Sequence, residues 1–212
     1  TMALFREHIT IGALVGAVGA VLTYFYALAT DPLLLAVLFF VTVGASFLPD
    51  IDSDSGVPFY LVFGTFTLAC AGLALYYALI HYRADLYLLI GVPLAVFFIV
   101  WFVVGGIFKK FTHHRGIMHS IPAALIAGLL VFLILKYIGK GEGVAALFAL
   151  ATALGYASHL ILDEVRAENI LDGNPFVPRR SLGSAVKIFS NSGAINLFTY
   201  LLLATLVYTV LA

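Results

Sequence analysis

The chain consists of seven long apolar runs separated by short polar segments. A membrane-spanning helix needs roughly 20 mostly apolar residues, and five of the runs approach that length while the second and fifth are shorter. A charged residue at a helix centre costs about 2.5–3.5 kcal/mol, and no run has one in its core. The pattern predicts an all-α, polytopic transmembrane helical bundle with about seven spans. These are Ile9–Ala29, Leu33–Leu48, Val57–Ile80, Leu86–Phe108, Ile121–Leu135, Val144–Leu162 and Ala194–Leu211.

Composition supports a membrane location and excludes several classes of protein. Hydrophobic residues make up 63% of the 212, charged residues only 10%, and the mean hydropathy is +1.09. A soluble domain of this size could not bury so much apolar surface, whereas a lipid bilayer accommodates it. The formal net charge of zero gives no reason to expect a nucleic-acid partner. Cys70 is the only cysteine in the sequence, so neither a set of disulfides within the chain nor a metal cluster bound by several thiolates is expected.

The chain is predicted to form one integral membrane domain, residues 1–212. Residues 57–108 form an extra transmembrane hairpin, and residues 163–193 form the longest polar segment, expected to be a cytoplasmic loop. Alternation of seven spans puts eight Lys and Arg residues on the face of the N-terminus and three on the other. The positive-inside rule therefore places the N-terminus in the cytoplasm and the C-terminus on the opposite side of the inner membrane.

The same alternation gathers most titratable groups on the cytoplasmic face. Five of the six histidines fall there, and only His81, expected to be solvated, lies opposite. Because the alternation was derived from hydrophobicity alone, this grouping is independent support for a shared site. The grouped residues are His8, His113, His114, His119, His159, Asp50, Asp52, Asp54 and Asp163.

Two segments of this face carry candidate ligands close to helix ends. His8 stands at the start of the first span, before a small-residue pattern that begins at Gly12 and lets another helix approach closely. Pro49 disfavours helical geometry at the preceding residue, so the second span should end there. In the extended segment expected next, Asp50 and Asp52 would point the same way and present two carboxylates to a cation. A polar turn is the alternative.

The third segment contains His114 and His119. Helical positions five apart lie about 140° apart, so these two side chains would not share one helix face. Pro122 belongs in a first turn, and the helix should therefore begin near Ser120, with Ser120 as its N-cap. His114 then lies in a turn and His119 at the helix entrance, where both can converge on one point. A basic loop that binds lipid headgroups is the alternative.

The fourth segment places His159 and Asp163 four residues apart, on one face of a helix and one turn apart. That spacing suits two ligands of one metal, or a ligand and the carboxylate that orients it. Taken alone, a hydrogen-bonded pair at a helix end is the more common arrangement. The four segments together on one face point to a metal site.

Four short motifs, taken in their order along the chain, resemble those of the YdjM-like family of membrane proteins. They are an N-terminal "H…G", "LPDID", "HRGIMHS" and "SHLILD". The motifs cover about three quarters of the chain. The resemblance implies a metal-dependent hydrolase that uses one or two divalent ions, zinc first and manganese or iron as alternatives. The family is in turn remotely similar to zinc-dependent phospholipase C and P1-type nucleases. The metal ligands that the resemblance implies are His8, Asp50, Asp52, His114, His119, His159 and Asp163.

One position departs from the family pattern, because Met118 stands where the family commonly has Thr. The expected substrate is a phosphoester at the cytoplasmic face, lipid-linked phosphoesters included. Asp52 or Asp163, if not fully engaged as a ligand, would serve as general base. Arg115 would bind an anionic oxygen, since guanidinium pairs bidentately with phosphate. Arg179 and Arg180 suit that role or act only as topology determinants.

Three other functions fit parts of the pattern. A metal or proton transporter would carry ionisable residues in mid-membrane, but here they gather at one edge. An intramembrane metalloprotease needs a His-Glu-x-x-His string, which the sequence lacks, although "LDG" resembles its second metal motif. A phosphatidic-acid-type phosphatase shares the His-x-x-x-Asp fragment but requires a Pro-Ser-Gly-His motif that does not occur here.

The alternation makes a prediction about topology. Single cysteines introduced at Asp54 and Arg179 should react with a membrane-impermeant reagent from the cytoplasmic side, and one at Lys140 from the opposite side. Labelling of Asp54 and Lys140 from the same side would contradict the alternation and remove its support for a shared site.

Overall fold

The computed structural model describes residues 5–52, 57–82, 85–111, 117–167 and 186–212. Within these ranges the chain is all-helical, apart from one isolated bridge between Ser120 and Lys187. The structure divides into two compact units, residues 1–49 with 115–212 and residues 50–114. Each of the seven predicted spans coincides with helical structure, which confirms the predicted fold class.

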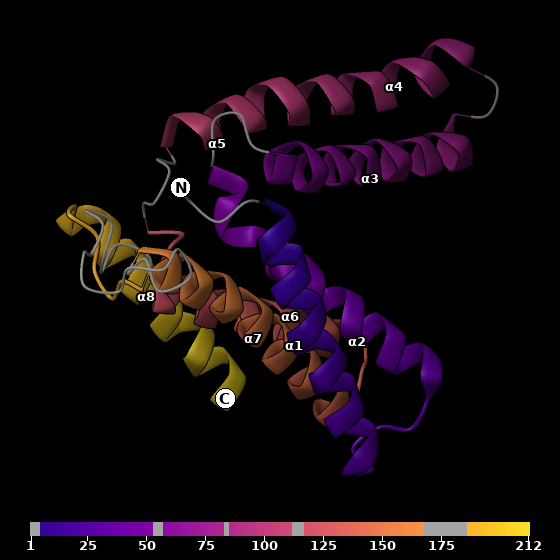
Figure 1. The fold of residues 1–212 in the computed structure, drawn as a ribbon. Coiled ribbons are helices and arrows are strands. Elements are labelled where there is room, and N and C mark those ends of the chain that lie inside the picture. Colours follow the sequence, from indigo (N-terminus) through magenta and orange to yellow (C-terminus); the bar gives the residue numbers. More distant parts are fainter. Residues whose placement is uncertain (1–4, 53–56, 83–84, 112–116, 168–185) are drawn as a thin grey trace. The chain divides into compact units, whose positions relative to one another are not determined.

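The first unit is a helical bundle in which α7 is central (Figure 1). The helix α7 (Glu142–Ala167) lies against α1 (Phe5–Phe25), α2 (Pro32–Ala45) and α6 (Ile121–Tyr137), and α6 also contacts α8 (Gly193–Leu211). In the most apolar stretch of α7, 50% of the residues are buried, more than in any other candidate span. The central helix is therefore the one that brings the other elements of this unit together.

The second unit is the predicted hairpin of residues 57–108, extended at both ends. It comprises α3 (Val57–His81), α4 (Leu86–Phe98), a π-helical turn η2 (Ile99–Val104) and α5 (Gly105–Phe111). The two arms of the hairpin run antiparallel (Figure 1). Asp85 caps the second arm by accepting hydrogen bonds from the backbone N–H groups of Tyr87 and Leu88.

Most large apolar side chains of both units face outward, as expected of a protein whose solvent is lipid. In the described part of the chain, five helical stretches are long and apolar enough to cross a membrane, with the second arm of the hairpin (α4, η2 and α5) counted as one. The helices α2 and α6 are shorter apolar helices of 14 and 17 residues. In the second arm of the hairpin only 6% of the most apolar stretch is buried within the protein. Its remaining surface is suited to contact with hydrocarbon.

Local signals in the sequence predicted some helix ends and missed others. The helix α6 begins at Ile121 with Ser120 as N-cap, as predicted, and the Ser120 hydroxyl accepts a hydrogen bond from the Ala123 N–H. The prediction of an extended segment after Pro49 is wrong, because residues Leu48–Asp52 form a 3₁₀ helix, η1. With three residues per turn, positions two apart point about 120° apart. The observed backbone therefore removes the basis of the predicted pairing of the Asp50 and Asp52 carboxylates.

The predicted loop of residues 163–193 begins later than expected. The helix α7 continues through Ala167, so Asp163 is a helical residue. Residues 168–185 lie outside the described part of the chain, and residues 186–192 lead into α8. His159 and Asp163 thus share one helix, as the spacing argument required.

Glycines allow α1, α2 and α7 to pack closely near the cytoplasmic ends predicted for them. A Cβ atom at Gly12 would overlap the Ser46 side chain, and one at Gly16 would lie 3.1 Å from Phe39. This confirms the close approach predicted from the small-residue pattern. On α7, a Cβ atom at Gly155 would overlap the backbone carbonyl of Thr42 and come within 2.9 Å of Ala45 Cβ.

Gly155→Ala should therefore destabilise the protein, because a methyl group would be forced against backbone that cannot move aside. Overpacking of this kind costs about 1–3 kcal/mol, which should lower the Tm of the purified protein in detergent by several degrees. Gly19→Ala is the matched control, since nothing lies within 4 Å of a Cβ atom there. It should leave the Tm unchanged or raise it, and equal losses in both variants would contradict the packing argument.

Candidate metal centre

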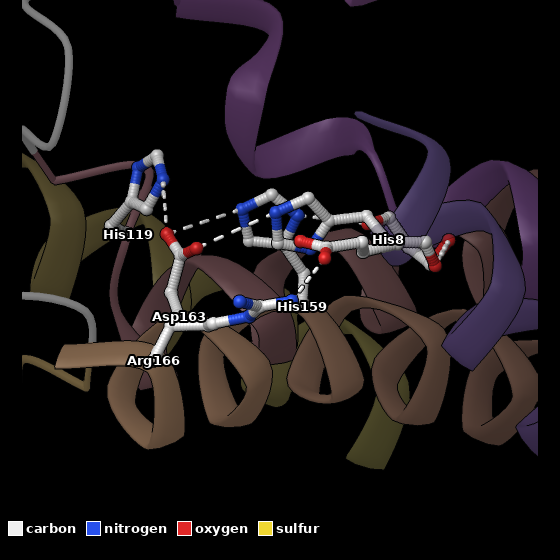
Figure 2. Close-up of polar contacts among 7 residues, drawn as sticks. His8, His119, His159, Asp163 and Arg166 are labelled. Atoms are coloured by element: carbon white, nitrogen blue, oxygen red, sulfur yellow. Dashed lines mark hydrogen bonds and ion pairs between the residues drawn. The ribbon is translucent and has the colours of Figure 1, made fainter. Parts of the chain in front are cut away.

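Four buried polar side chains from three elements meet in the first unit (Figure 2). His8 comes from α1, His119 from the turn before α6, and His159 and Asp163 from α7. Their relative exposures are 1%, 0%, 0% and 4%. Burying a carboxylate in this way is unfavourable unless a positive charge or hydrogen bonds compensate it.

Both oxygens of Asp163 face imidazole nitrogens (Figure 2). Oδ1 lies 3.4 Å from His8 Nε2, and Oδ2 lies 3.7 Å from both His119 Nε2 and His159 Nε2. These separations exceed the 2.7–3.2 Å of a good N–H···O hydrogen bond. The three contacts are thus longer than strong hydrogen bonds, and a positively charged group beside them would stabilise the carboxylate.

The same separations suit ligands of one metal ion. Two nitrogen or oxygen ligands about 2.1 Å from a tetrahedral zinc ion are about 3.4 Å from each other. One ligand atom from each of His8, His159 and Asp163 lies within 4.8 Å of the other two. Three imidazoles and a carboxylate are also a donor set that zinc, manganese and iron accept. The residues present thus fit a divalent transition metal.

A backbone carbonyl orients His159 for this role. The Nδ1 atom of His159 lies 2.9 Å from the carbonyl oxygen of Ser46, at the end of α2. A carbonyl only accepts, so Nδ1 carries the proton and donates it. In the neutral ring the Nε2 lone pair then faces the Asp163 carboxylate. A cation between the two groups would compensate their repulsion, and a carbonyl contact to the other ring nitrogen is the usual support of a metal-bound histidine.

His8 is held beside His159. Their rings are stacked with centroids 3.7 Å apart and planes at 14°. Two imidazolium rings in this position would repel each other, whereas neutral rings stack favourably and are the form that binds metal. The Ser46 hydroxyl lies 3.0 Å from the carbonyl oxygen of His8 and 2.7 Å from that of Val43, and its one proton is shared between these two acceptors. Ser46 thereby contacts both histidines, one through its carbonyl and one through its hydroxyl.

Two hydrogen bonds hold the turn that carries His119 before the start of α6. The hydroxyl of buried Tyr156 donates to the Met118 carbonyl at 2.5 Å. The Ile121 N–H donates to the Lys187 carbonyl at 2.9 Å, so the segment before α8 also braces this turn. These contacts hold the backbone on both sides of His119.

An ion pair links α1 to α7 beside the ligands. Arg166 Nη2 contacts Glu7 Oε1, and their side chains are 19% and 32% exposed. Glu7 precedes His8, and Arg166 follows Asp163 by nearly one helical turn. The pair therefore joins the two helices where two of the candidate ligands arise (Figure 2).

The structure brings together four of the seven predicted metal ligands: His8, His119, His159 and Asp163. Asp50 and Asp52 belong to the second unit, so their participation stays a prediction. His81 is exposed at the end of α3, as expected. The remaining predicted residues, which are His113, His114, Arg115, Asp54, Arg179 and Arg180, lie outside the described residues.

The sequence argument missed Ser46 and the Glu7–Arg166 pair. Any residue supplies a backbone carbonyl, so nothing in the sequence distinguishes the one at Ser46. Glu7 and Arg166 are 159 positions apart, and no local pattern pairs them. The positions of Glu7 directly before His8 and of Arg166 three residues after Asp163 were the only available signal.

Comparison with known proteins assigns the chain to a family. The model of the YdjM inner membrane protein family matches residues 2–212, and the chain belongs to this family. The resemblance inferred from the motifs is thereby confirmed. No curated protein and no solved structure matches the chain. With its apolar helices, the chain is a multi-pass inner membrane protein with a His/Asp cluster that could hold a metal ion.

Removing a ligand should remove the metal and leave the fold inserted in the membrane. We expect His159→Ala and Asp163→Ala to lower the zinc content of purified protein, because each removes a donor from the cluster. Membrane insertion should persist, because it depends on the apolar runs. Elemental analysis of membrane-extracted protein checks this, with exposed His81→Ala as the control that keeps full occupancy. Full zinc occupancy in both ligand variants would show that the ligands are misassigned.

Proposed function

We propose that this member of the YdjM inner membrane protein family is a metal-dependent hydrolase of phosphoesters. The observation that carries the proposal is the buried Asp163 carboxylate faced by the Nε2 atoms of three histidines at 3.4–3.7 Å. Neutral imidazole and carboxylate ligands of this kind support hydrolytic zinc sites. These residues would hold a zinc ion, which when bound would polarise a phosphoryl oxygen as a Lewis acid and lower the pKa of bound water to about 7.

The residues of the chain divide into ligands and a base. Both oxygens of Asp163 face imidazoles, which favours a ligand role for this residue. Asp52 is then the better of the two candidates for general base, taking a proton from the attacking water on a carboxylate oxygen. Asp50 and His114 complete the proposed ligand set and would allow a second ion.

Arg115 is proposed to bind the substrate. It follows the candidate ligand His114 directly, and its guanidinium group can donate two parallel hydrogen bonds to a phosphoryl oxygen pair. Charge stabilisation of this kind acts on the transition state and does not depend on metal ligation. Metal binding and turnover are therefore separable in this proposal.

The proposed reaction takes place at the cytoplasmic face. The distribution of eight basic residues against three favours that orientation. Arg166 pairs with Glu7 next to His8 and Asp163, which is consistent with a site at the polar border of the bilayer. A substrate at that border is either a soluble phosphoester or a lipid with a phosphorylated headgroup.

Arg115→Ala should keep the metal and lose activity. The loss of one transition-state contact is typically worth about 10²–10³ in rate. Arg115→Lys should recover only part of it, because an ammonium group cannot reproduce the two-pronged contact. The measurement is kcat of zinc-loaded protein on a panel of soluble and lipid phosphoesters, with zinc content determined in parallel.

The Asp52→Ala variant is the negative control for this assay, because it lacks the proposed general base. Equal turnover by wild type and Asp52→Ala across the whole panel would mean that the activity does not come from this site. The hydrolase proposal would then fail, and a metal-binding or transport role would take its place.

A further inference from the structure

The segment before α8 carries exposed apolar side chains. Residues 186–189 include three of them, and the exposed fractions of Val186, Ile188 and Phe189 are 39%, 55% and 63%. In water an exposed apolar cluster is unfavourable, and it usually indicates a surface that contacts another protein or a membrane. The position of the segment along α8 distinguishes these two partners.

The segment lies beside the beginning of α8. The hydroxyl of Tyr200 donates a hydrogen bond to the Ile188 carbonyl at 2.8 Å, and the rings of Phe189 and Tyr200 have centroids 5.3 Å apart. Tyr200 follows Gly193, the first residue of α8, by seven positions, which corresponds to about 10 Å along the helix axis. Residues 188 and 189 therefore run alongside the first two turns of the helix.

Those turns belong to a helix that is long and apolar enough to cross the bilayer. The 19 residues of α8 extend about 28 Å, close to the roughly 30 Å of the hydrocarbon core. On the same turns, Leu197 and Phe198 are 64% and 68% exposed and face outward. A segment beside these turns lies at the edge of the hydrocarbon core, and its exposed side chains continue the lipid-facing surface of α8.

The backbone of the segment is hydrogen-bonded in a way that suits hydrocarbon, where polar backbone groups need partners within the protein. Asn196 Oδ1 accepts from the Ser190 N–H at 2.7 Å, and Asn196 Nδ2 donates to the Ser190 carbonyl at 2.9 Å. The Ile188 carbonyl accepts from the phenol on α8, and the Lys187 carbonyl accepts from the Ile121 N–H at 2.9 Å. Four backbone groups of residues 187–190 thus have protein partners and do not require water.

Lys187 is the one charged residue among residues 186–192, and its charge is compatible with this position. The apolar stem of a lysine allows its ammonium group to reach the headgroup layer while the backbone lies deeper. A basic side chain at this level is also attracted to anionic lipids.

We propose that residues 186–190 form a membrane-inserted strap, with the Ile188 and Phe189 side chains in the edge of the hydrocarbon core and Asn196 as the tether of its backbone. The partner of this surface is lipid. The strap also bonds Ile121, two residues after His119, so one segment joins the bilayer to the turn of a candidate ligand. The strap goes beyond the proposed hydrolase function and does not depend on it.

The test is electron paramagnetic resonance of spin labels at single cysteines. The full-length protein carries Cys70→Ala, which removes its own cysteine, and is placed in nanodiscs of phosphatidylethanolamine and phosphatidylglycerol. Oxygen concentrates in hydrocarbon and nickel ethylenediaminediacetate in water, so the ratio of their collision rates with the label reports its surroundings. The oxygen-to-nickel ratio at Ile188→Cys should be close to that at lipid-facing Leu201→Cys. It should be severalfold higher than at exposed Lys140→Cys, which lies between α6 and α7.

Two results would overturn the strap. A ratio at Ile188→Cys equal to that at Lys140→Cys would place the segment in water. A label at Ile188→Cys that neither reagent reaches would show that protein covers the surface. Phe189→Cys is a second position with the same expected ratio, and it decides the question if Ile188→Cys does not purify as a folded protein.

Asn196→Leu tests the tether. It removes the partners of the Ser190 N–H and carbonyl, which water can replace and hydrocarbon cannot. The strap should therefore move toward water, and the oxygen-to-nickel ratio of the label at Ile188→Cys should fall severalfold. Asn191→Leu changes an exposed asparagine of the same segment and should not lower the ratio. Equal ratios in the two variants would overturn the assignment of Asn196 as the tether.

Discussion

The buried carboxylate of Asp163 is the group on which the arrangement of the first unit depends. A charge with 4% exposure in a membrane domain must be compensated nearby. The compensation comes from three histidines on three elements, so α1, the entrance of α6, and α7 all have to meet at one point. Separations of 3.4–3.7 Å also fit ligands that share one metal ion.

Close helix packing makes that meeting possible. Gly12 brings α1 onto Ser46, and Gly155 brings α7 onto the backbone of Thr42. Only with α1 and α7 both against α2 can Ser46 contact His8 through its hydroxyl and His159 through its carbonyl. Small residues are thus a condition for the orientation of the histidines, as well as for the association of helices in lipid.

The same three helices separate farther along, where Gly19 faces open space. The first unit therefore combines a tightly packed polar centre with an apolar hollow farther along the same helices.

The sequence by itself determined the helices and the grouping of the candidate ligands. Apolar runs have to be helical in lipid because no water satisfies the backbone, and Ser120 caps α6 through a contact within three residues. The helical spacing of His159 and Asp163 was also readable. The orientation with respect to the membrane and the roles of Asp50, Asp52, His114 and Arg115 stay predictions.

Only the tertiary structure decided how the ligands are held. The Ser46 carbonyl that orients His159 lies 113 residues away in the chain, and Glu7 lies 159 residues from Arg166. Such contacts depend on how helices pack, which hydrophobic patterning does not specify, because every lipid-facing and helix-facing surface is similarly apolar. The 3₁₀ helix at Leu48–Asp52 escaped prediction because Pro49 excludes some geometries without selecting one.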